Sequence, residues 1–463
     1  MKRAVRFCLL LSVAACAVGP DYEKPPVSTP TAFKESGDWK RATPQDEGQR
    51  GPWWTLYGDP VLNRLEGHID LSSQTLKQAE STYREALAAV DLARASLFPT
   101  LALDKSAIRS GAGAHQAATL YDIGANASWS PDLWGRVRHT IDSQEASAQG
   151  SAADLASVRL ALQAALATDY FALRTQDSLS QILDQIATDR AKIESLTATQ
   201  YQEGVAAQAD LLAAQTQTEN AKAALAAARI NRAQLEHALA VLLGHSPADF
   251  TLEPAALPSQ IPITPASLPA TLLERRPDIA SAERQMAAAN AQIGIAQAAY
   301  YPNITLSASY GFSGSVISSL LSTAHSLWSL GGSASETVLD FGARGAATEE
   351  ARAFYDKSVA TYRQTVLTAF QEVEDSLAAQ RILVEQETAQ QQAAADQRRI
   401  EQITHNQYEE GVAPLSTLLS AQISRLTAEQ MALAVTSSRW AASVSLIQSL
   451  GGGWRRTADG GSF

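Results

Sequence analysis

The chain has 463 residues, of which 48 are acidic and 37 basic, and its formal net charge is −11. This balance excludes ordinary nucleic-acid binding, which requires clustered Lys and Arg side chains. The two cysteines, Cys8 and Cys16, both lie near the start, so they provide neither a disulfide framework nor a cysteine metal site. No apolar run of about 18 residues follows them, which excludes a transmembrane helix.

The first residues are typical of a secreted lipoprotein. Residues 1–15 contain three basic residues, a short apolar run and two final alanines, which together predict a signal peptide. The tetrapeptide Val13-Ala14-Ala15-Cys16 resembles a bacterial lipobox, in which the cysteine becomes the lipid-modified first residue. We therefore expect a covalent lipid on Cys16 that anchors the chain to a membrane. Ala17, in place of Asp, favours the outer membrane by the same resemblance. An ordinary leader with an incidental cysteine is the alternative.

Prolines divide the remainder of the chain. Seven of the 18 lie between Pro20 and Pro60, and seven more between Pro247 and Pro277. We expect an extended, lipidated N-terminal segment over residues 16–60 and a proline-rich equatorial linker over residues 247–277. Residues 132–246 and 303–413 contain no proline and are rich in helix-forming residues.

Glycines indicate an internal tandem repeat with an offset of 207 residues. The repeated glycines are Gly135, Gly204 and Gly244 in the first copy and Gly342, Gly411 and Gly451 in the second. The residues around the middle glycines, 200–206 and 407–413, are also closely similar. Such spacing predicts two copies of one structural unit. The first repeat is expected over residues 61–246 and the second over residues 278–451, followed by a C-terminal tail over 452–463.

Each repeat predicts a long helical hairpin. A helix over residues 136–202, about 100 Å long, should end at Gly204 and return as a helix over 208–243. The corresponding elements of the second repeat are the helix 343–409, the turn at Gly411 and the return helix 414–449. Apolar residues recur with a period of 3.5 from Leu155 to Ile193, which favours antiparallel coiled-coil packing. Helices of this length require a bundle, a tube or a fibre.

A shorter helix and then a different period precede each long helix. Over residues 99–131 and 302–340, apolar residues alternate with small polar ones, and aromatic residues collect at the segment ends. This pattern predicts two β-hairpins of a transmembrane barrel, although soluble hairpins would alternate in the same way. Four strands cannot close a barrel, and open sheet edges are not tolerated in lipid. Several chains must then share one barrel, and three would supply twelve strands.

One sequence block resembles the signature of a known family, the TolC-like outer membrane factors of tripartite efflux pumps. This block runs from Leu272-Leu273-Glu274-Arg275-Arg276-Pro277-Asp278-Ile279 through Ile293-Gly294-Ile295-Ala296 to Tyr301-Pro302. Further matches, typical of the lipoprotein (NodT) group that serves RND-type transporters, are Val18-Gly19-Pro20-Asp21-Tyr22, Trp53-Trp54, Asp59-Pro60 and Leu450-Gly451-Gly452-Gly453-Trp454.

The resemblance implies a mixed α/β membrane protein, mainly α. Long coiled-coil hairpins would form a periplasmic tunnel in a homotrimer, and four strands per chain would contribute to a shared twelve-stranded barrel. The expected partners are a periplasmic adaptor (membrane fusion protein), an inner-membrane RND transporter and outer-membrane lipid. The protein would be a passive conduit in the cell outer membrane, lipid-anchored and spanning, that extends into the periplasm. We expect no enzymatic activity, no metal and no cofactor except the lipid on Cys16, because no catalytic or metal-ligand spacing occurs.

The resemblance also implies two sites at the inner tip of the tunnel. The adaptor would dock on the two turns, through Tyr201, Gly204, Val205, Tyr408, Gly411 and Val412. A closed gate would be held by Asp210 and Tyr408, weakly here because Ala413, Thr417 and Ser420 replace charged residues common in the family. Asp210 as a solvated residue at a helix start is the alternative. For Arg275-Arg276, anion binding and a structural ion pair are the two interpretations, and the structural one is favoured.

Two other functions remain open from the sequence. The chain could be the outer-membrane channel of a type I protein secretion system. It could also be a periplasmic coiled-coil lipoprotein without a transport role.

Overall fold

The computed structural model describes residues 18–27, 29–30, 33–34, 52–111, 117–258, 260–262 and 276–452. The leader, Cys16, residues 259 and 263–275 of the linker, which include Arg275, and nearly all of the tail 452–463 lie outside these residues. The chain divides into two compact units, each built from three segments. The first comprises Met1–Val27, Ser81–Ala153 and Ala280–Gln364, and the second comprises Ser28–Glu80, Asp154–Ile279 and Thr365–Phe463.

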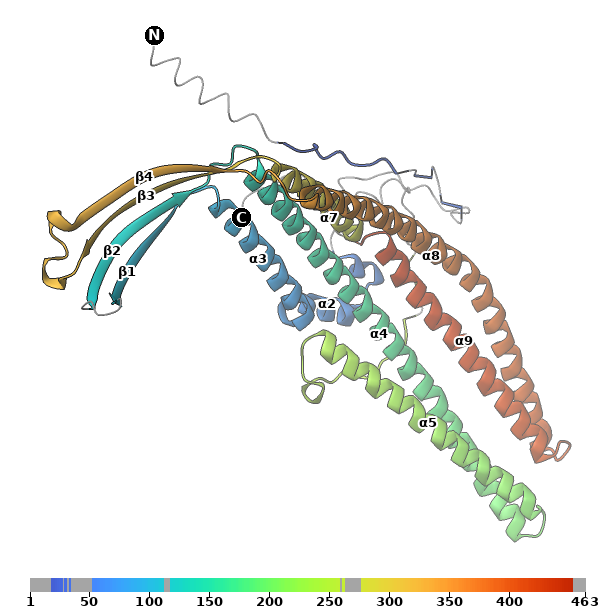
Figure 1. The fold of residues 1–463 in the computed structure, drawn as a ribbon. Coiled ribbons are helices and arrows are strands. Elements are labelled where there is room, and N and C mark those ends of the chain that lie inside the picture. Colours follow the sequence, from blue (N-terminus) through green and yellow to red (C-terminus); the bar gives the residue numbers. More distant parts are fainter. Residues whose placement is uncertain are drawn as a thin grey trace. The chain divides into compact units, whose positions relative to one another are not determined.

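The first unit contains one antiparallel sheet of four strands in the order β1-β2-β3-β4 (Figure 1). The strands are β1 (Thr100–Ser110), β2 (Ala118–Trp129), β3 (Asn303–Gly314) and β4 (Ser326–Ser335). Each strand pairs only with its neighbours in this order, so within the described residues the outer edges of β1 and β4 have no partner.

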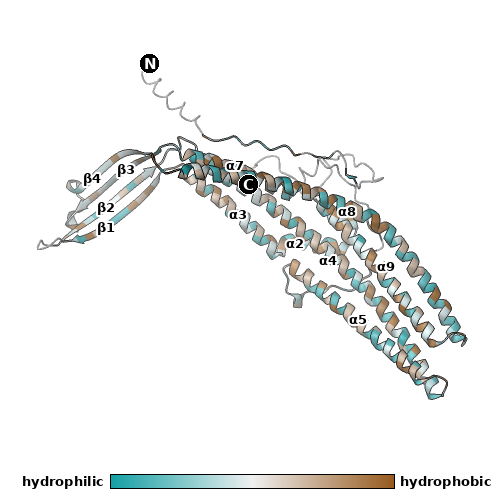
Figure 2. Cartoon of the chain, turned by 45° about the vertical axis from the view of Figure 1, so that its right-hand side comes forward, coloured by the Kyte–Doolittle hydropathy of each residue, from teal (hydrophilic) through white to brown (hydrophobic). Residues whose placement is uncertain are grey.

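The sheet has one apolar and one polar face, because side chains alternate along each strand. Register aligns Leu103, Ala125, Tyr310 and Trp328 in one row of the apolar face. On the polar face, Ser309 and Ser329 lie opposite each other, with their hydroxyl oxygens 2.8 Å apart. The alternating hydropathy along the strands is visible in Figure 2. The apolar face is exposed, with Trp328 78% and Leu103 67% accessible.

Helices flank the sheet in the sequence. α3 (Gln74–Ala95) precedes β1, α4 (Arg136–Gln202) follows β2, α7 (Pro277–Ala298) precedes β3 and α8 (Ala343–Glu409) follows β4. α4 and α8 begin in the first unit and end in the second. Within the described residues, none of the helices combines the length and apolarity needed to cross a membrane.

The second unit contains two helical hairpins whose elements have matching lengths. α4 and α8 each have 67 residues, and their return helices α5 (Gln208–Leu242) and α9 (Leu415–Ser449) each have 35. α4 runs beside α5, and α8 beside α9 (Figure 1). Pro414 precedes α9 with ψ 155°, so this return helix begins one residue later than expected. Ile193 of α4 packs with Leu418 and Leu419 of α9, which joins the hairpins.

A hydrophobic core stabilises the second unit near α2 (Pro60–Ser72). Asp59 caps α2 by accepting hydrogen bonds from the backbone N–H groups of Val61 and Leu62, at 2.8 and 3.1 Å. Phe171 stacks on Trp440 with ring centroids 4.2 Å apart. Both rings are almost fully buried, and together with Tyr170 they are the largest fully buried side chains of this core.

Candidate functional site

The two inter-helix turns have the same backbone geometry. Gly204 and Gly411 adopt φ values of 77° and 72°, in the left-handed region that glycine enters without strain. The N–H of Gly204 donates to Tyr201 O and that of Gly411 to Tyr408 O, both at 3.0 Å. The N–H of the following valine donates to the carbonyl five residues earlier in the helix, at 2.8 Å for Val205 and for Val412. Gly204 and Gly411 therefore end α4 and α8 by one mechanism.

The turns present apolar side chains to solvent. Val205 is 76% and Val412 72% exposed, and Tyr201 is also exposed. A Cβ added at either glycine would meet no atom within 4 Å. Within the second unit, these turns offer small, accessible apolar surfaces.

The structure does not bring the two expected gate residues together within the chain. The Asp210 carboxylate accepts from the backbone N–H of Ala207 at 3.4 Å, at the start of α5. Tyr408 is half-buried beside Leu415 and Leu419, and its hydroxyl donates to Gln200 Oε1 at 3.4 Å. Asp210 thus occupies the helix-start position that was the alternative interpretation.

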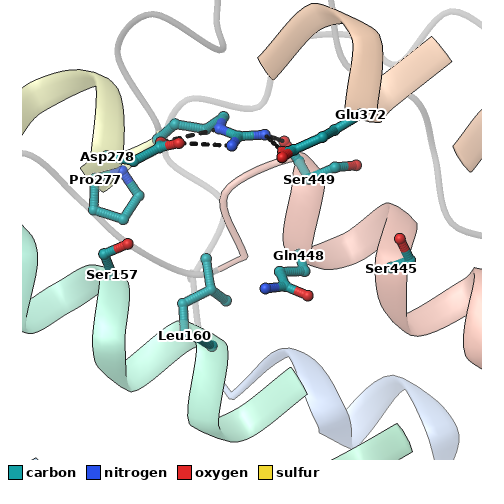
Figure 3. A pocket seen from close by; sticks show the side chains of 10 residues that line it. Ser157, Leu160, Pro277, Asp278, Glu372, Ser445, Gln448 and Ser449 are labelled. Atoms are coloured by element: carbon teal, nitrogen blue, oxygen red, sulfur yellow. Dashed lines mark hydrogen bonds and ion pairs between the residues drawn. The ribbon is translucent and has the colours of Figure 1, made fainter. Parts of the chain in front are cut away.

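Of the pair Arg275-Arg276, the structure describes Arg276, and its side chain is buried. It forms a cluster of contacts with Asp278, Glu372 and Ser449, which are labelled in Figure 3. Its Nε and Nη2 donate to the Asp278 carboxylate at 3.0 and 2.7 Å. Its Nη1 lies 2.6 Å from a Glu372 carboxylate oxygen and donates to the Ser449 carbonyl at 3.1 Å. Burial alone would lower the pKa of Arg276, but the hydrogen bonds and charges of Asp278 and Glu372 outweigh it and raise the pKa.

This cluster joins α7, α8 and α9. Asp278 belongs to the first turn of α7, Glu372 lies on α8, and Ser449 is the last residue of α9. A cavity of about 350 Å³ beside Arg276 is lined by residues of α4, α7, α8 and α9. Because the donors of Arg276 are directed at these protein groups, the cluster supports the structural interpretation for Arg276.

The N-terminal strap, residues 18–27, is held against the first unit. The N–H of Val18 donates to Trp134 O at 3.2 Å, and Val18 O lies 3.1 Å from His139 Nε2. Further along, Asn290 donates to Pro20 O at 3.0 Å, and Lys24 pairs with Glu283 at 2.7 Å. The Trp134 ring stacks on Tyr301 at 4.9 Å, close to the start of β3.

Gly294 of the signature block is explained by this strap. A Cβ at Gly294 would lie 2.6 Å from the His139 ring, and one at Gly19 would lie 2.9 Å from the Gly294 Cα. Neither position has room for a side chain. The glycines of the block and of the strap are thus required by one close contact with the imidazole.

One buried acidic residue was not anticipated. Glu66 of α2 is 1% exposed, and within the described residues neither carboxylate oxygen has a hydrogen-bond partner. Burial, and then the charge of Asp70, raise its pKa to about 9. The sequence did contain a sign of this burial, because Leu62, Leu65, Glu66 and Ile69 follow the spacing of one helix face.

Within the described residues, no cluster of His, Cys, Asp or Glu could hold a metal ion.

Comparison with known proteins identifies the family. The family model described as "Outer membrane efflux protein" matches residues 69–245 and 268–452, which is most of the chain. The chain belongs to this family. The resemblance seen in the sequence is therefore confirmed: the chain is an outer-membrane efflux channel, a transport conduit and not an enzyme.

Individual relatives agree along almost the whole chain. The solvent efflux pump outer membrane protein SrpC of Pseudomonas putida is 31% identical, over 96% of this chain and 97% of the relative. The cation efflux system protein CusC of Escherichia coli O6:H1 is 28% identical, over 97% and 98%. Among solved structures, the outer-membrane channel OprN superimposes with a TM-score of 0.84 at 28% identity, covering 94% of this chain and 99% of that one.

Proposed function

We propose that three copies of this chain form a continuous conduit across the outer membrane and the periplasm. The four-stranded sheet with two unpaired edges and an exposed apolar face carries this proposal. Unpaired edges are not stable in lipid, so each copy must share its edges with neighbouring copies. Three copies supply the twelve strands of a closed barrel, and the hairpins below it form the wall of the periplasmic tunnel.

The conduit would be one of three components of an efflux assembly, and the other two would deliver its substrates. A periplasmic adaptor and an inner-membrane RND transporter are the proposed partners, and relatives named as pump and efflux-system components support this assignment. The same names favour efflux over type I protein secretion. The adaptor would dock at the tip, where Tyr201, Gly204 and Val205 of one turn correspond to Tyr408, Gly411 and Val412 of the other.

The matching helix lengths and turn hydrogen bonds support an origin of the two hairpins by internal duplication. The agreement between the two hairpins also supports the proposed domain boundaries, with repeats over 61–246 and 278–451 separated by the linker 247–277. The family match in two segments, 69–245 and 268–452, agrees with that division.

The strap supports lipidation of Cys16. Cys16 lies two residues before Val18, whose backbone is hydrogen-bonded to Trp134 and His139. Trp134 stacks with Tyr301, and such aromatic pairs favour the membrane–water interface. A lipid on Cys16 would therefore enter the membrane close to the base of the strands.

The proposed function is tested by assembly and conductance. Detergent-extracted, full-length protein should run as a trimer in native mass spectrometry and should form ion-conducting channels in planar phosphatidylcholine bilayers. Deletion of the gene should sensitise cells to substrates of the pump, and the intact chain should restore resistance. A purified protein that stays monomeric, or that does not conduct, would refute the proposal.

A further inference from the structure

The four strands carry four charged side chains, and these are segregated by sign. Asp104 of β1 and Asp122 of β2 lie on the polar face. Lys105 and Arg109, both on β1, lie on the opposite, apolar face. Strand alternation and register fix this assignment, because Asp104 and Ser106 share one face while Lys105 and Arg109 share the other.

The two cations lie in an otherwise apolar and aromatic surface. Lys105 is in one row with Ile123, Phe312 and Ser326. The next row towards the loops contains Ala107, Tyr121 and Gly314, and Arg109 follows in the row after that, opposite Thr119. Lys105 and Arg109 are both exposed. On this face of β1 only the small residue Ala107 lies between them, so both long side chains are accessible from the same side.

The protein offers these cations no carboxylate on this face. Residues 99–131 and 302–335, which include every strand and both connecting loops, contain Asp104 and Asp122 as their only acidic residues. Both are engaged on the polar face, where Asp104 accepts from Asn126 at 2.6 Å and Asp122 from Ser106 at 3.2 Å. A neighbouring copy that paired its β4 with β1 would contribute no acidic residue either.

Position along the strand identifies the leaflet. The helices join the strands at Thr100, Trp129, Asn303 and Ser335, so Lys105 and Arg109 lie from the middle of β1 towards its loop end. In the proposed trimer the apolar face meets lipid and the loop end meets the exterior. This inference rests on that proposed function. A cation on the lipid face costs about 2–4 kcal/mol at the bilayer midplane and much less where it reaches a charged interface.

We propose that Lys105 and Arg109 bind the phosphate groups of a phosphorylated glycolipid of the outer leaflet. Guanidinium and ammonium groups form short, charge-assisted hydrogen bonds with phosphate oxygens. Such a lipid supplies the anion that the barrel lacks on this face, while its acyl chains cover Leu101 and Leu103 on the same face of β1. The site is thus a lipid-binding surface formed by one edge strand.

The test measures lipid binding by the full-length trimer. Native mass spectrometry would give apparent affinities for lipid A, for enzymatically dephosphorylated lipid A and for phosphatidylglycerol. We expect wild-type protein to prefer lipid A, and the double variant Lys105→Gln/Arg109→Gln to bind it about tenfold more weakly, equivalent to about 1.4 kcal/mol. Binding should also weaken as ionic strength rises.

Two controls make the result specific. Lys192→Gln/Lys222→Gln removes the same charge from exposed helix positions and should leave lipid A affinity unchanged. The charge-conserving Lys105→Arg/Arg109→Lys should retain binding. Equal lipid A affinity of wild type and double variant, or equal binding of dephosphorylated lipid A, would overturn the inference. Equal binding of phosphatidylglycerol would also overturn it and indicate a general anionic surface.

Conductance separates this inference from the proposed function. In phosphatidylcholine bilayers, which contain no anionic lipid, the Lys105→Gln/Arg109→Gln variant should form channels like wild type. If wild-type protein formed no channels in these bilayers, the proposed conduit itself would be refuted. Normal channels combined with unchanged lipid A affinity would refute only the lipid site.

Discussion

At the scale of single residues, Glu66 of the second unit is a buried carboxyl group with no hydrogen-bond partner among the described residues. Its carboxyl is buried in α2 one turn before Asp70, which pairs with Arg159 at 2.9 Å. A pKa raised to about 9 means that the folded protein holds Glu66 protonated at neutral pH. The stability associated with this neutral form is fully present below pH 4.5, the ordinary value, and is lost as pH rises towards 9.

Replacement of this residue should therefore change the pH dependence of folding. Glu66→Gln retains the shape of the side chain but cannot ionise. Its free energy of unfolding, relative to that of wild type, should therefore be higher at pH 8 than at pH 5, by on the order of 3 kcal/mol. Urea unfolding of the detergent-solubilised trimer at the two pH values measures this difference. Glu85→Gln, exposed on α3, is the matched control. The same pH dependence in wild type and Glu66→Gln would contradict the prediction.

Asp210 presents a different question, because its visible contact is local. A capping contact to Ala207 at 3.4 Å is worth about 1 kcal/mol or less, and its loss should not alter the pore. If Asp210 instead contacts a neighbouring hairpin in the closed trimer, Asp210→Ala should raise single-channel conductance. Tyr408→Phe, which removes only a hydroxyl, should do the same. Unchanged conductance in both variants would exclude the pair from the gate.

At the scale of elements, the helices and their pairing into hairpins were predictable from the sequence, but the side-chain contacts between distant elements were not. The absence of proline and the repeated glycines predicted helices over 136–202 and 343–409, and these helices end at Gln202 and Glu409. Local composition determines such elements, because helix formation depends on neighbours a few residues apart. The contact of Arg276 with Glu372 and Ser449 joins residues far apart in sequence, so no local pattern could reveal it.

The same distinction applies to the candidate site. The turn glycines were evident from sequence because their backbone conformation is a local requirement. The half-burial of Tyr408 depends on how the hairpins pack, whereas the bond of Asp210 to Ala207 is local to the start of α5. The resemblance assigned these two residues a shared role between hairpins, but within one chain they bond different partners, Asp210 the Ala207 backbone and Tyr408 the Gln200 side chain.

The turns themselves yield a prediction about docking. A Cβ added at Gly204 or Gly411 would meet no atom within 4 Å, so Gly204→Glu or Gly411→Glu should cost mainly the left-handed backbone penalty, about 1 kcal/mol. The added charge should nevertheless prevent an adaptor from covering the turn. We expect loss of export with the trimer intact, measured by substrate susceptibility and native gels. Gly58→Glu, at φ 64° with equally open surroundings but outside the turns, should retain export.

At the scale of the whole molecule, the proposed shared barrel rests on the two outer edges of the four-stranded sheet. The sheet ends in β1 on one side and β4 on the other, with no closure between them. The conclusion that copies must combine follows from hydrogen-bond satisfaction in lipid and does not depend on any single side chain.

Disulfide cross-linking tests this pairing directly. Both native cysteines precede residue 17, so the strands provide a cysteine-free background. Leu101→Cys on β1, combined in turn with cysteines along β4, should cross-link different copies and produce a covalent trimer on denaturing gels. Leu101→Cys combined with a cysteine on β3 serves as the control, because those strands are not neighbours. Cross-links confined to single chains would contradict a shared barrel.

The strap has a consequence for the order in which the molecule assembles. Residues 18–27 are synthesised long before their partners, because Lys24 and Pro20 contact residues 259 and 270 positions later in the chain, at Glu283 and Asn290. Contacts of such separation form slowly, since a long loop must close before they contribute. Residues 18–27, although synthesised early, should thus be among the last to fold. The proposed lipid on Cys16 would then be positioned only after the rest of the chain has folded.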